Sequence, residues 1–202
     1  MRKATLFAIA AGAAILAGVS VGGAVSSKSN DGSFKMADIR GSGAALTKTY
    51  SIQVPDVNYR NDWVQLGTFS VQDEDPKKGA GQLHIVYTSK EAVAAYTGKG
   101  DFPDGTILIK DVFLTKHEDL GTGHVSYADK LAGRFVMIRD KGGKLTGKNP
   151  LWGDGWGWAF FKGEEKKKTV TTDYKADCLG CHQPVKDTNW LFVQGYPVLG
   201  GK

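Results

Sequence analysis

The chain has 202 residues, with 26 Lys and Arg against 21 Asp and Glu, which gives a formal net charge of +5. Positive and negative residues are interspersed, and the lysine run 166–168 directly follows Glu164 and Glu165, so we expect no nucleic-acid partner. Having only two cysteines excludes a disulfide-rich scaffold, and the length suits one domain with its own core.

The first residues have the layout of an export signal. Arg2 and Lys3 precede an uncharged stretch of apolar and small residues that ends at Ala24. This layout is typical of a secretory signal, so we expect residues 1–24 to be a signal peptide. The alternative is an uncleaved membrane anchor over residues 5–25, which the Ala and Gly content disfavours. In both cases we expect the remainder to lie outside the cytoplasm.

Residues 25–49 are rich in Ser and Gly without apolar periodicity, which predicts a flexible linker. The folded domain is expected to span residues 50–202. Within it, β-branched and aromatic runs separated by Gly and Pro predict strands at 63–71, 83–87, 106–114, 135–139 and 156–161.

Helices are fewer. Residues 90–96 predict one helix with Ser89 as its N-cap, and residues 172–181 predict a second. His117 and His124 flank a predicted loop at 118–123 and are expected to face solvent. The elements together predict an α+β fold that is mainly antiparallel β, a curved antiparallel sheet with a few packed helices.

The two cysteines carry the clearest motif. Cys178-Leu-Gly-Cys181-His182 has the C-x-x-C-H spacing at which c-type haem is attached. In such a site the two thiols add to the haem vinyl groups, and the adjacent histidine becomes the axial iron ligand. The motif therefore predicts one covalent haem c, bound through Cys178 and Cys181 on a short helix near the C-terminus, with His182 on the iron.

A cysteine pair at this spacing has two other common uses, a redox pair and a zinc site. A thioredoxin-like redox pair is expected early in a βαβ unit, whereas this pair lies near the end of the chain. A zinc site needs two further ligands, and His84, His117 and His124 show no tight spacing. Haem attachment is the favoured interpretation.

The second axial position determines what such a haem does. A simple electron carrier has a Met or His there, but no Met or His follows His182. Met36 falls in the linker, and Met137 lies in a strand where core packing is expected. An open iron site that binds or converts a small molecule is therefore predicted. The alternative is a six-coordinate electron-transfer cytochrome with Met137 or His84 as sixth ligand.

Four segments, Tyr59–Trp63, Phe102–Lys110, Cys178–His182 and Val193–Val198, resemble the cytochrome P-460 and cytochrome c′-β family. The similarity extends from about Val54 to Leu199. It implies a periplasmic, mostly β protein, usually a homodimer, with five-coordinate haem iron. The implied ligand is a small molecule such as nitric oxide, carbon monoxide or hydroxylamine, and a redox partner protein is possible.

The P-460 branch of this family oxidises hydroxylamine and has a lysine joined covalently to the haem. The resemblance places Lys110 at that position. In a strand, Lys110 shares a face with Leu108 and Val112, which directs it inward and demands a partner or a covalent bond. The alternative is a wet face near a sheet edge.

The c′-β branch binds gases under a phenylalanine cap. Phe135 stands about where the P-460 branch has a distal carboxylate, and the segment 134–136 offers no acid. This departure removes the proton acceptor that hydroxylamine oxidation requires, so an oxidoreductase and a gas-binding protein both remain open. His84 is a further distal candidate, as hydrogen-bond donor or proton relay, against an outward strand histidine.

Overall fold

The computed structural model describes residues 45–200. The predicted signal at 1–24 lies outside these residues, as does nearly all of the predicted linker. Ala45 and Leu46 are already buried in the core, and Leu46 bridges Ile52, so packed structure begins a few residues before residue 50. In the described part of the chain, no helix combines the length and apolar character needed to cross a membrane.

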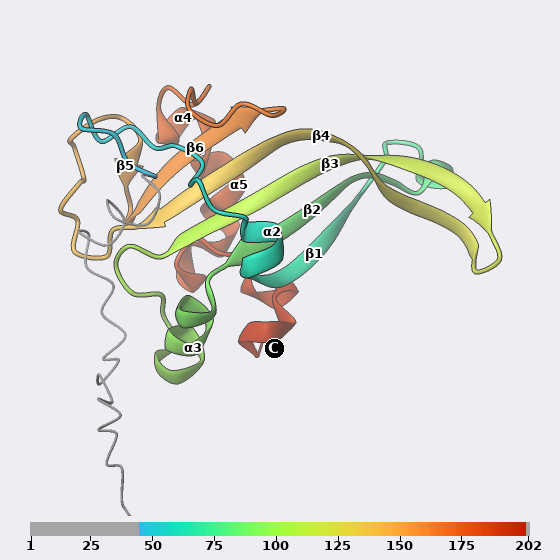
Figure 1. The fold of residues 1–202 in the computed structure, drawn as a ribbon, viewed down its shortest axis with the longest axis horizontal. Coiled ribbons are helices and arrows are strands. Elements are labelled where there is room, and N and C mark those ends of the chain that lie inside the picture. Colours follow the sequence, from blue (N-terminus) through green and yellow to red (C-terminus); the bar gives the residue numbers. More distant parts are fainter. Residues whose placement is uncertain (1–44, 201–202) are drawn as a thin grey trace, which may run out of the picture. The chain divides into compact units, whose positions relative to one another are not determined.

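Six strands form one antiparallel sheet in the order β1-β2-β3-β4-β6-β5 (Figure 1). The strands are β1 (Val64–Gln72), β2 (Ala80–Thr88), β3 (Ile107–Leu120), β4 (Gly123–Arg139), β5 (Trp152–Gly153) and β6 (Trp156–Lys162). The helices are α2 (Tyr59–Asp62), α3 (Lys90–Lys99), α4 (Tyr174–Asp177) and α5 (Leu179–His182), with 3-10 turns at Pro76–Lys78, Gln183–Thr188, Val193–Gly195 and Pro197–Leu199. The predicted α+β class with a curved antiparallel sheet is confirmed.

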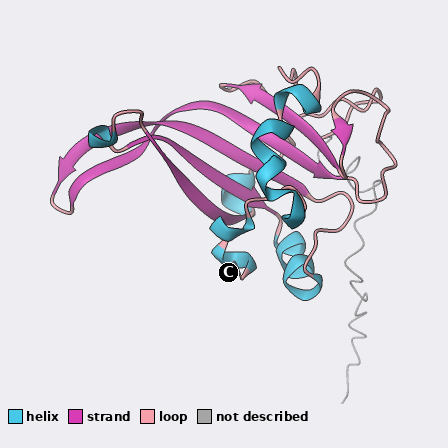
Figure 2. Ribbon diagram, turned by 180° about the vertical axis from the view of Figure 1, so that it is seen from behind, coloured by secondary structure: helices cyan, strands magenta, loops and turns pink. Residues whose placement is uncertain are grey.

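Both faces of the sheet are covered, because the strands alternate apolar side chains toward two cores. One core contains Ile109, Val136 and Phe161 and is covered by residues 45–59 and the loop before β5. The other contains Leu108, Met137 and Trp158 and is covered by the C-terminal segment. Figure 2 shows the C-terminal helices lying across this second face.

The helix starts follow local capping. The Ser89 side chain accepts a hydrogen bond from the Ala92 amide at the start of α3, as predicted. Asp173 caps α4 in the same way through the Lys175 amide. The predicted helix at 172–181 is divided, because Cys178 leaves helical geometry between α4 and α5.

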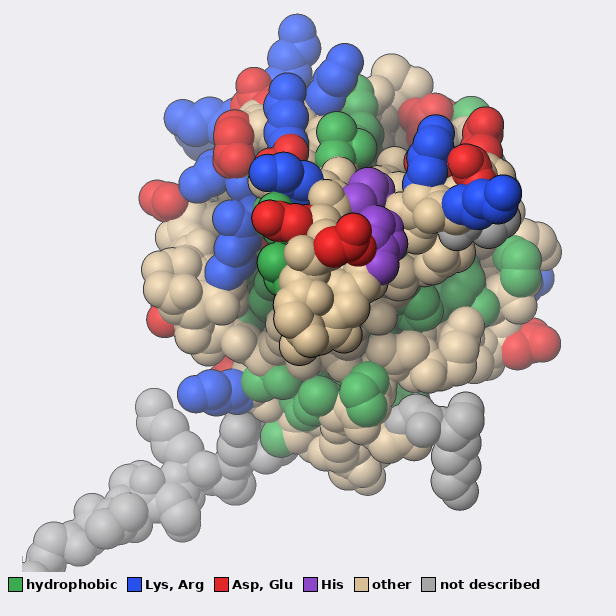
Figure 3. All heavy atoms as spheres, turned by 90° about the vertical axis from the view of Figure 1, so that its right-hand side faces the viewer, with side chains coloured by type: hydrophobic (Ala, Val, Ile, Leu, Met, Phe, Trp, Pro, Cys, Tyr) green, Lys and Arg blue, Asp and Glu red, His purple; other side chains and the backbone are tan. Residues whose placement is uncertain are grey.

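β3 and β4 continue past the rest of the sheet as a long hairpin (Figure 1). The predicted loop at 118–123 is wrong, since β3 runs to Leu120 and β4 begins at Gly123. His117 and His124 lie across the ladder with parallel rings 6.3 Å apart, and His124 Nδ1 is 2.8 Å from Asp119. Figure 3 looks onto this end, where histidines lie among acidic and basic side chains at the surface.

On the face of the sheet that carries the first core, a buried ionic cluster connects α2 to β3 and β4. Asp111 is fully buried and accepts hydrogen bonds from Tyr59 Oη at 2.8 Å and Arg60 Nε at 2.7 Å. Arg134 lies 3.5 Å from Asp111, donates to Tyr59 Oη and pairs with Glu164. The cluster compensates the desolvation of its own charges and fixes α2 against the sheet.

Candidate functional site

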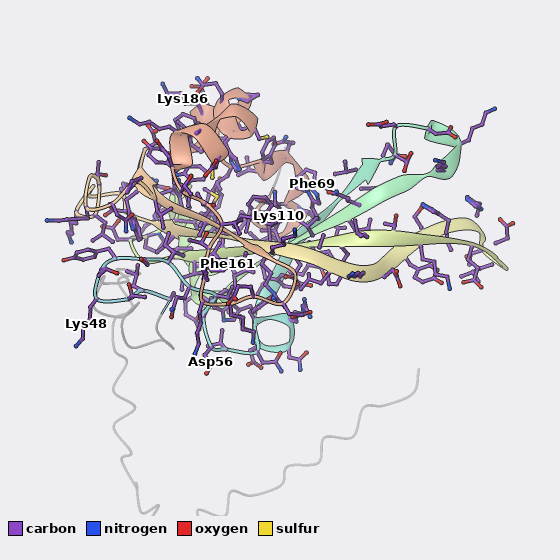
Figure 4. All side chains as sticks on the ribbon, turned by 90° about the horizontal axis from the view of Figure 1, so that it is seen from above. Lys48, Asp56, Phe69, Lys110, Phe161 and Lys186 are labelled. Carbon is purple, nitrogen blue, oxygen red and sulfur yellow. The ribbon has the colours of Figure 1, made fainter. Side chains whose placement is uncertain are left out.

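A cavity of about 540 Å³ lies between the second face of the sheet and the C-terminal segment. That volume is in the range of roughly 300–1,000 Å³ usual for cofactor and ligand sites. The wall is mostly apolar and includes Val86, Leu108, Val112, Met137, Trp158, Ala159, Leu191, Phe192 and Tyr196. Figure 4 shows Lys110 and Phe69 on the side of the sheet that carries the C-terminal helices, with Phe161 on the opposite side.

The helix side of the cavity is built from the cysteine motif. Cys178, Cys181 and His182 all line it. His182 Nδ1 is 2.6 Å from the carbonyl oxygen of Trp190. A carbonyl only accepts, so Nδ1 carries the proton and Nε2 remains as the nitrogen with a free lone pair. This is the tautomer that a metal-binding histidine requires.

Aromatic rings hold His182 in place. Trp158 meets its ring edge-on at 4.9 Å, and Phe192 does so at 5.5 Å. Trp158 is fixed in turn by stacking on Tyr174 and by donating its indole N–H to the Gly153 carbonyl. Burial lowers the pKa of His182, so the imidazole is kept neutral.

The two thiols are not equivalent. Cys178 is 8% exposed and Cys181 lies at the surface, and both are free rather than joined in a disulfide. Burial raises the pKa of the Cys178 thiol to about 11. A Cβ added at Gly180 would meet no atom within 4 Å, so the motif has open space beside it.

Lys110 and Phe135 face the cavity from adjacent strands. They are register partners in the β3–β4 ladder, and Lys110 Nζ lies 4.3 Å from the centre of the Phe135 ring. Phe160 stacks on Phe135 at 4.4 Å. No residue between 45 and 200 offers Lys110 a hydrogen bond or carboxylate, and burial lowers the pKa of its amine. The inward direction predicted for Lys110 is therefore observed, and the wet alternative is excluded.

His84 also lines the cavity, one cross-strand row beyond Lys110, where it pairs with Val112. Its Nε2 is 2.9 Å from Oε1 of Gln82, which lines the cavity as well. Burial, with Lys110 as the second cause, lowers the pKa of His84 to about 4. The outward alternative for His84 does not hold.

Met137 lies on the other side of Lys110. It belongs to the cross-strand row of Leu108 and Trp158, and Trp158 contacts His182. Met137 is also packed into the apolar core. Its place in the core indicates a packing role.

These residues fit a haem. The cavity is apolar and large enough for a cofactor, the paired thiols stand on its wall, and a neutral histidine presents a free lone pair. A metal ion held by side chains alone fits poorly, because within the described ranges no three His, Cys, Asp or Glu side chains gather in a way that could hold one.

Some lining residues were not predicted. Phe160 and Phe192 reach the cavity only through sheet register or the path of the C-terminal segment, neither of which is visible in the local sequence. Alternation along β2 would have placed Gln82 on the face of His84.

The comparison with protein families gives one match. The family model for cytochrome P-460 matches residues 57–193, well over half of the chain. The matched range begins before α2 and ends after the cysteine motif, so it includes every strand and all the cavity residues discussed above except those that follow residue 193. A comparison with curated proteins finds no match.

Proposed function

Because this chain belongs to the cytochrome P-460 family, a family of haem proteins that act on nitrogen species, we propose that it is an exported, periplasmic c-type cytochrome with one covalent haem and an open iron site. The ligand is a small nitrogen species, nitric oxide or hydroxylamine. The observation that carries the proposal is the single cavity wall shared by Cys178, Cys181 and His182.

Each residue of the motif has a distinct task in this proposal. Cys178 and Cys181 hold the cofactor through thioether bonds, and His182 provides the axial nitrogen. The Trp190 carbonyl orients His182 and increases the basicity of its ring through the 2.6 Å hydrogen bond. The haem iron supplies the ligand-binding and one-electron redox chemistry.

The part of the cavity wall formed by β3, β4 and β6 excludes water and makes the ligand site apolar. Phe135 and Phe160 stack as an apolar cap, and Lys110 lies against them with a desolvated amine. The lowered pKa increases the fraction of this amine that is neutral, the form able to bond to carbon, which supports a covalent bond between Lys110 and the porphyrin edge. The apolar cap favours small neutral ligands.

The position of Met137 supports an open site over the electron-transfer alternative. A second axial ligand would have to reach the iron from the side away from His182, and Met137 shares its row with Trp158, which contacts His182. His84 is the remaining candidate, and because its Nε2 is engaged by Gln82, only its Nδ1 would be available to the iron.

Two measurements test the proposal. The mass of the purified protein, before and after acid extraction of haem, should show one porphyrin retained on the chain. Carbon monoxide should change the spectrum of the reduced protein, because the sixth position is open. A chain without covalent porphyrin would refute haem attachment, and a low-spin spectrum that ignores carbon monoxide would refute the open site.

Assembly is a further part of the proposal. Family membership supports a homodimer and a redox partner protein. The molar mass from light scattering tests the first, and electron exchange with a small soluble cytochrome tests the second.

A further inference from the structure

The cavity contains few groups able to accept a proton or a hydrogen bond from a ligand. Among residues 45–200, the one carboxylate on its wall is Asp177, and its Oδ2 already accepts the amides of Thr172 at 2.8 Å and Asp173 at 3.2 Å. These hydrogen bonds lower the pKa of Asp177 and make it a weak base. Lys110 is a donor when charged. The remaining polar pair on the sheet wall is Gln82 and His84.

Gln82 and His84 are two residues apart on β2, so both side chains stand on the same face of the sheet. The amide oxygen of Gln82 lies 2.9 Å from Nε2 of His84. An amide oxygen only accepts, which places the ring proton on Nε2 and leaves a lone pair on Nδ1. No residue in the described part of the chain donates to this Nδ1.

The ring remains neutral in this setting. Burial and the nearby Lys110 lower the pKa of His84 to about 4, so protonation does not remove the lone pair at neutral pH. The other titratable groups on the cavity wall are Lys110, Asp177, Cys178, Cys181, His182 and Tyr196.

His84 also stands at a suitable place. Alternate residues of β3 form three successive cross-strand rows on the cavity face. The row of Leu108 includes Trp158, which contacts His182. The row of Lys110 follows, and the row of Val112 and His84 comes last. His84 is thus separated from His182 by the row of Lys110. His84 and His182 line the same cavity, so a ligand bound there can meet His84.

We propose that Gln82 is a positioning residue that fixes His84 in the tautomer whose Nδ1 accepts a hydrogen bond from the ligand. The cavity then favours small nitrogen compounds with O–H or N–H bonds, such as hydroxylamine, over diatomic gases. The inference rests on the haem site proposed above. It assigns His84 the accepting role, in contrast to the donating role considered from the sequence.

The experiment uses the full-length holoprotein and two probes. Hydroxylamine, added to the oxidised protein and followed in the first association phase, carries the donor groups. Carbon monoxide, added to the reduced protein, carries none. A hydrogen bond contributes about 1 kcal/mol, so His84→Leu and Gln82→Leu should each weaken hydroxylamine binding about fivefold while carbon monoxide affinity is unchanged.

Two further variants sharpen the result. Gln82→Glu keeps an accepting oxygen beside Nε2 and, at a pH above the pKa that His84 has in this variant, should bind hydroxylamine more tightly than Gln82→Leu does. His124→Leu removes an imidazole from the hairpin that does not line the cavity, and should alter neither probe.

Several outcomes would overturn the inference. Equal weakening of both probes would mean that Gln82 and His84 only shape the cavity. Weaker carbon monoxide binding with unchanged hydroxylamine binding would mean that His84 donates a hydrogen bond to the ligand. A six-coordinate parent that becomes five-coordinate in His84→Leu would make His84 an iron ligand. A haem-bearing parent with no response to either probe would refute the open site itself, and with it this inference.

Discussion

The side-chain nitrogen of Lys110 lies 4.3 Å from the centre of the Phe135 ring on the neighbouring strand. Lys110, expected from the resemblance to mark one branch of the family, and Phe135, expected to mark the other, are therefore in contact on one wall. The lysine and the phenylalanine do not exclude each other within this cavity, so substitutions are needed to distinguish a covalent lysine bond from gas binding alone.

Lys110→Met tests the covalent bond. Joining the amine to a porphyrin carbon breaks one N–H and one C–H bond and releases two electrons and two protons, which a peroxide accepts to give water. The bond would alter the conjugated ring, so we expect the parent to have a red-shifted ferrous band that Lys110→Met lacks. Lys116→Met, exposed on the same strand, is the control. Identical spectra for parent and Lys110→Met would show that no bond forms.

The pKa of His84 predicts a pH dependence of stability. The folded state lowers this pKa from 6.5 to about 4, so folded protein binds fewer protons than unfolded protein between these values. The contribution of His84 to the free energy of unfolding should therefore fall as the pH decreases from 6.5 to 4 and level off below. Urea titrations should show a shallower fall for His84→Gln. An unaltered pH profile in that variant would contradict the predicted pKa.

The ionic cluster behind the sheet predicts a large, non-additive loss of stability. Asp111→Ala leaves Arg134 buried without one of its charged partners, which typically costs about 3–5 kcal/mol. Replacing both, with Asp111→Leu and Arg134→Met, should cost less, because no buried guanidinium is left unpaired, while Arg60, 40% exposed, can be solvated. Asp129→Ala, exposed on the hairpin, should have little effect. Chemical denaturation measures all three, and a double variant less stable than Asp111→Ala would contradict the argument.

Gly133 supports the aromatic cap. A Cβ at this position would lie 2.5 Å from the Phe161 carbonyl oxygen and 2.6 Å from the Phe160 ring. Gly133→Ala should therefore lower stability by about 1–3 kcal/mol and displace Phe160 from Phe135. Thermal unfolding and carbon monoxide affinity would report the two effects. Gly121→Ala, where a Cβ meets nothing within 4 Å, is the matched control, and equal behaviour of the two variants would disprove the role.

The apolar strands could be predicted because burial on two faces leaves a strong pattern, as in the segment 106–114. The outer part of the hairpin could not. Residues 115–130 are mostly polar and exposed on both faces, so their strands are held by backbone pairing that composition does not reveal. The two-residue β5 is too short for any pattern.

The site shows the same division. Cys178, Cys181 and His182 form a local motif that sequence reading detects, and alternation placed Lys110 inward. The Asp111 cluster depends on which neighbours a side chain meets across strands, whereas Gln82 and His84 lie two residues apart on one strand. Tyr59 is 52 residues from Asp111 and 75 residues from Arg134 along the chain, yet it contacts both. No local pattern encodes such distances.

Strand β3 places Lys110 in the cavity and Asp111 in the cluster behind it, on opposite surfaces of one ribbon of backbone. The side chains that line the cavity and the side chains that stabilise the sheet therefore belong to separate sets. A laboratory that redesigns the pocket wall at alternate positions can leave the anchoring layer intact, and can reinforce that layer without altering what the pocket admits.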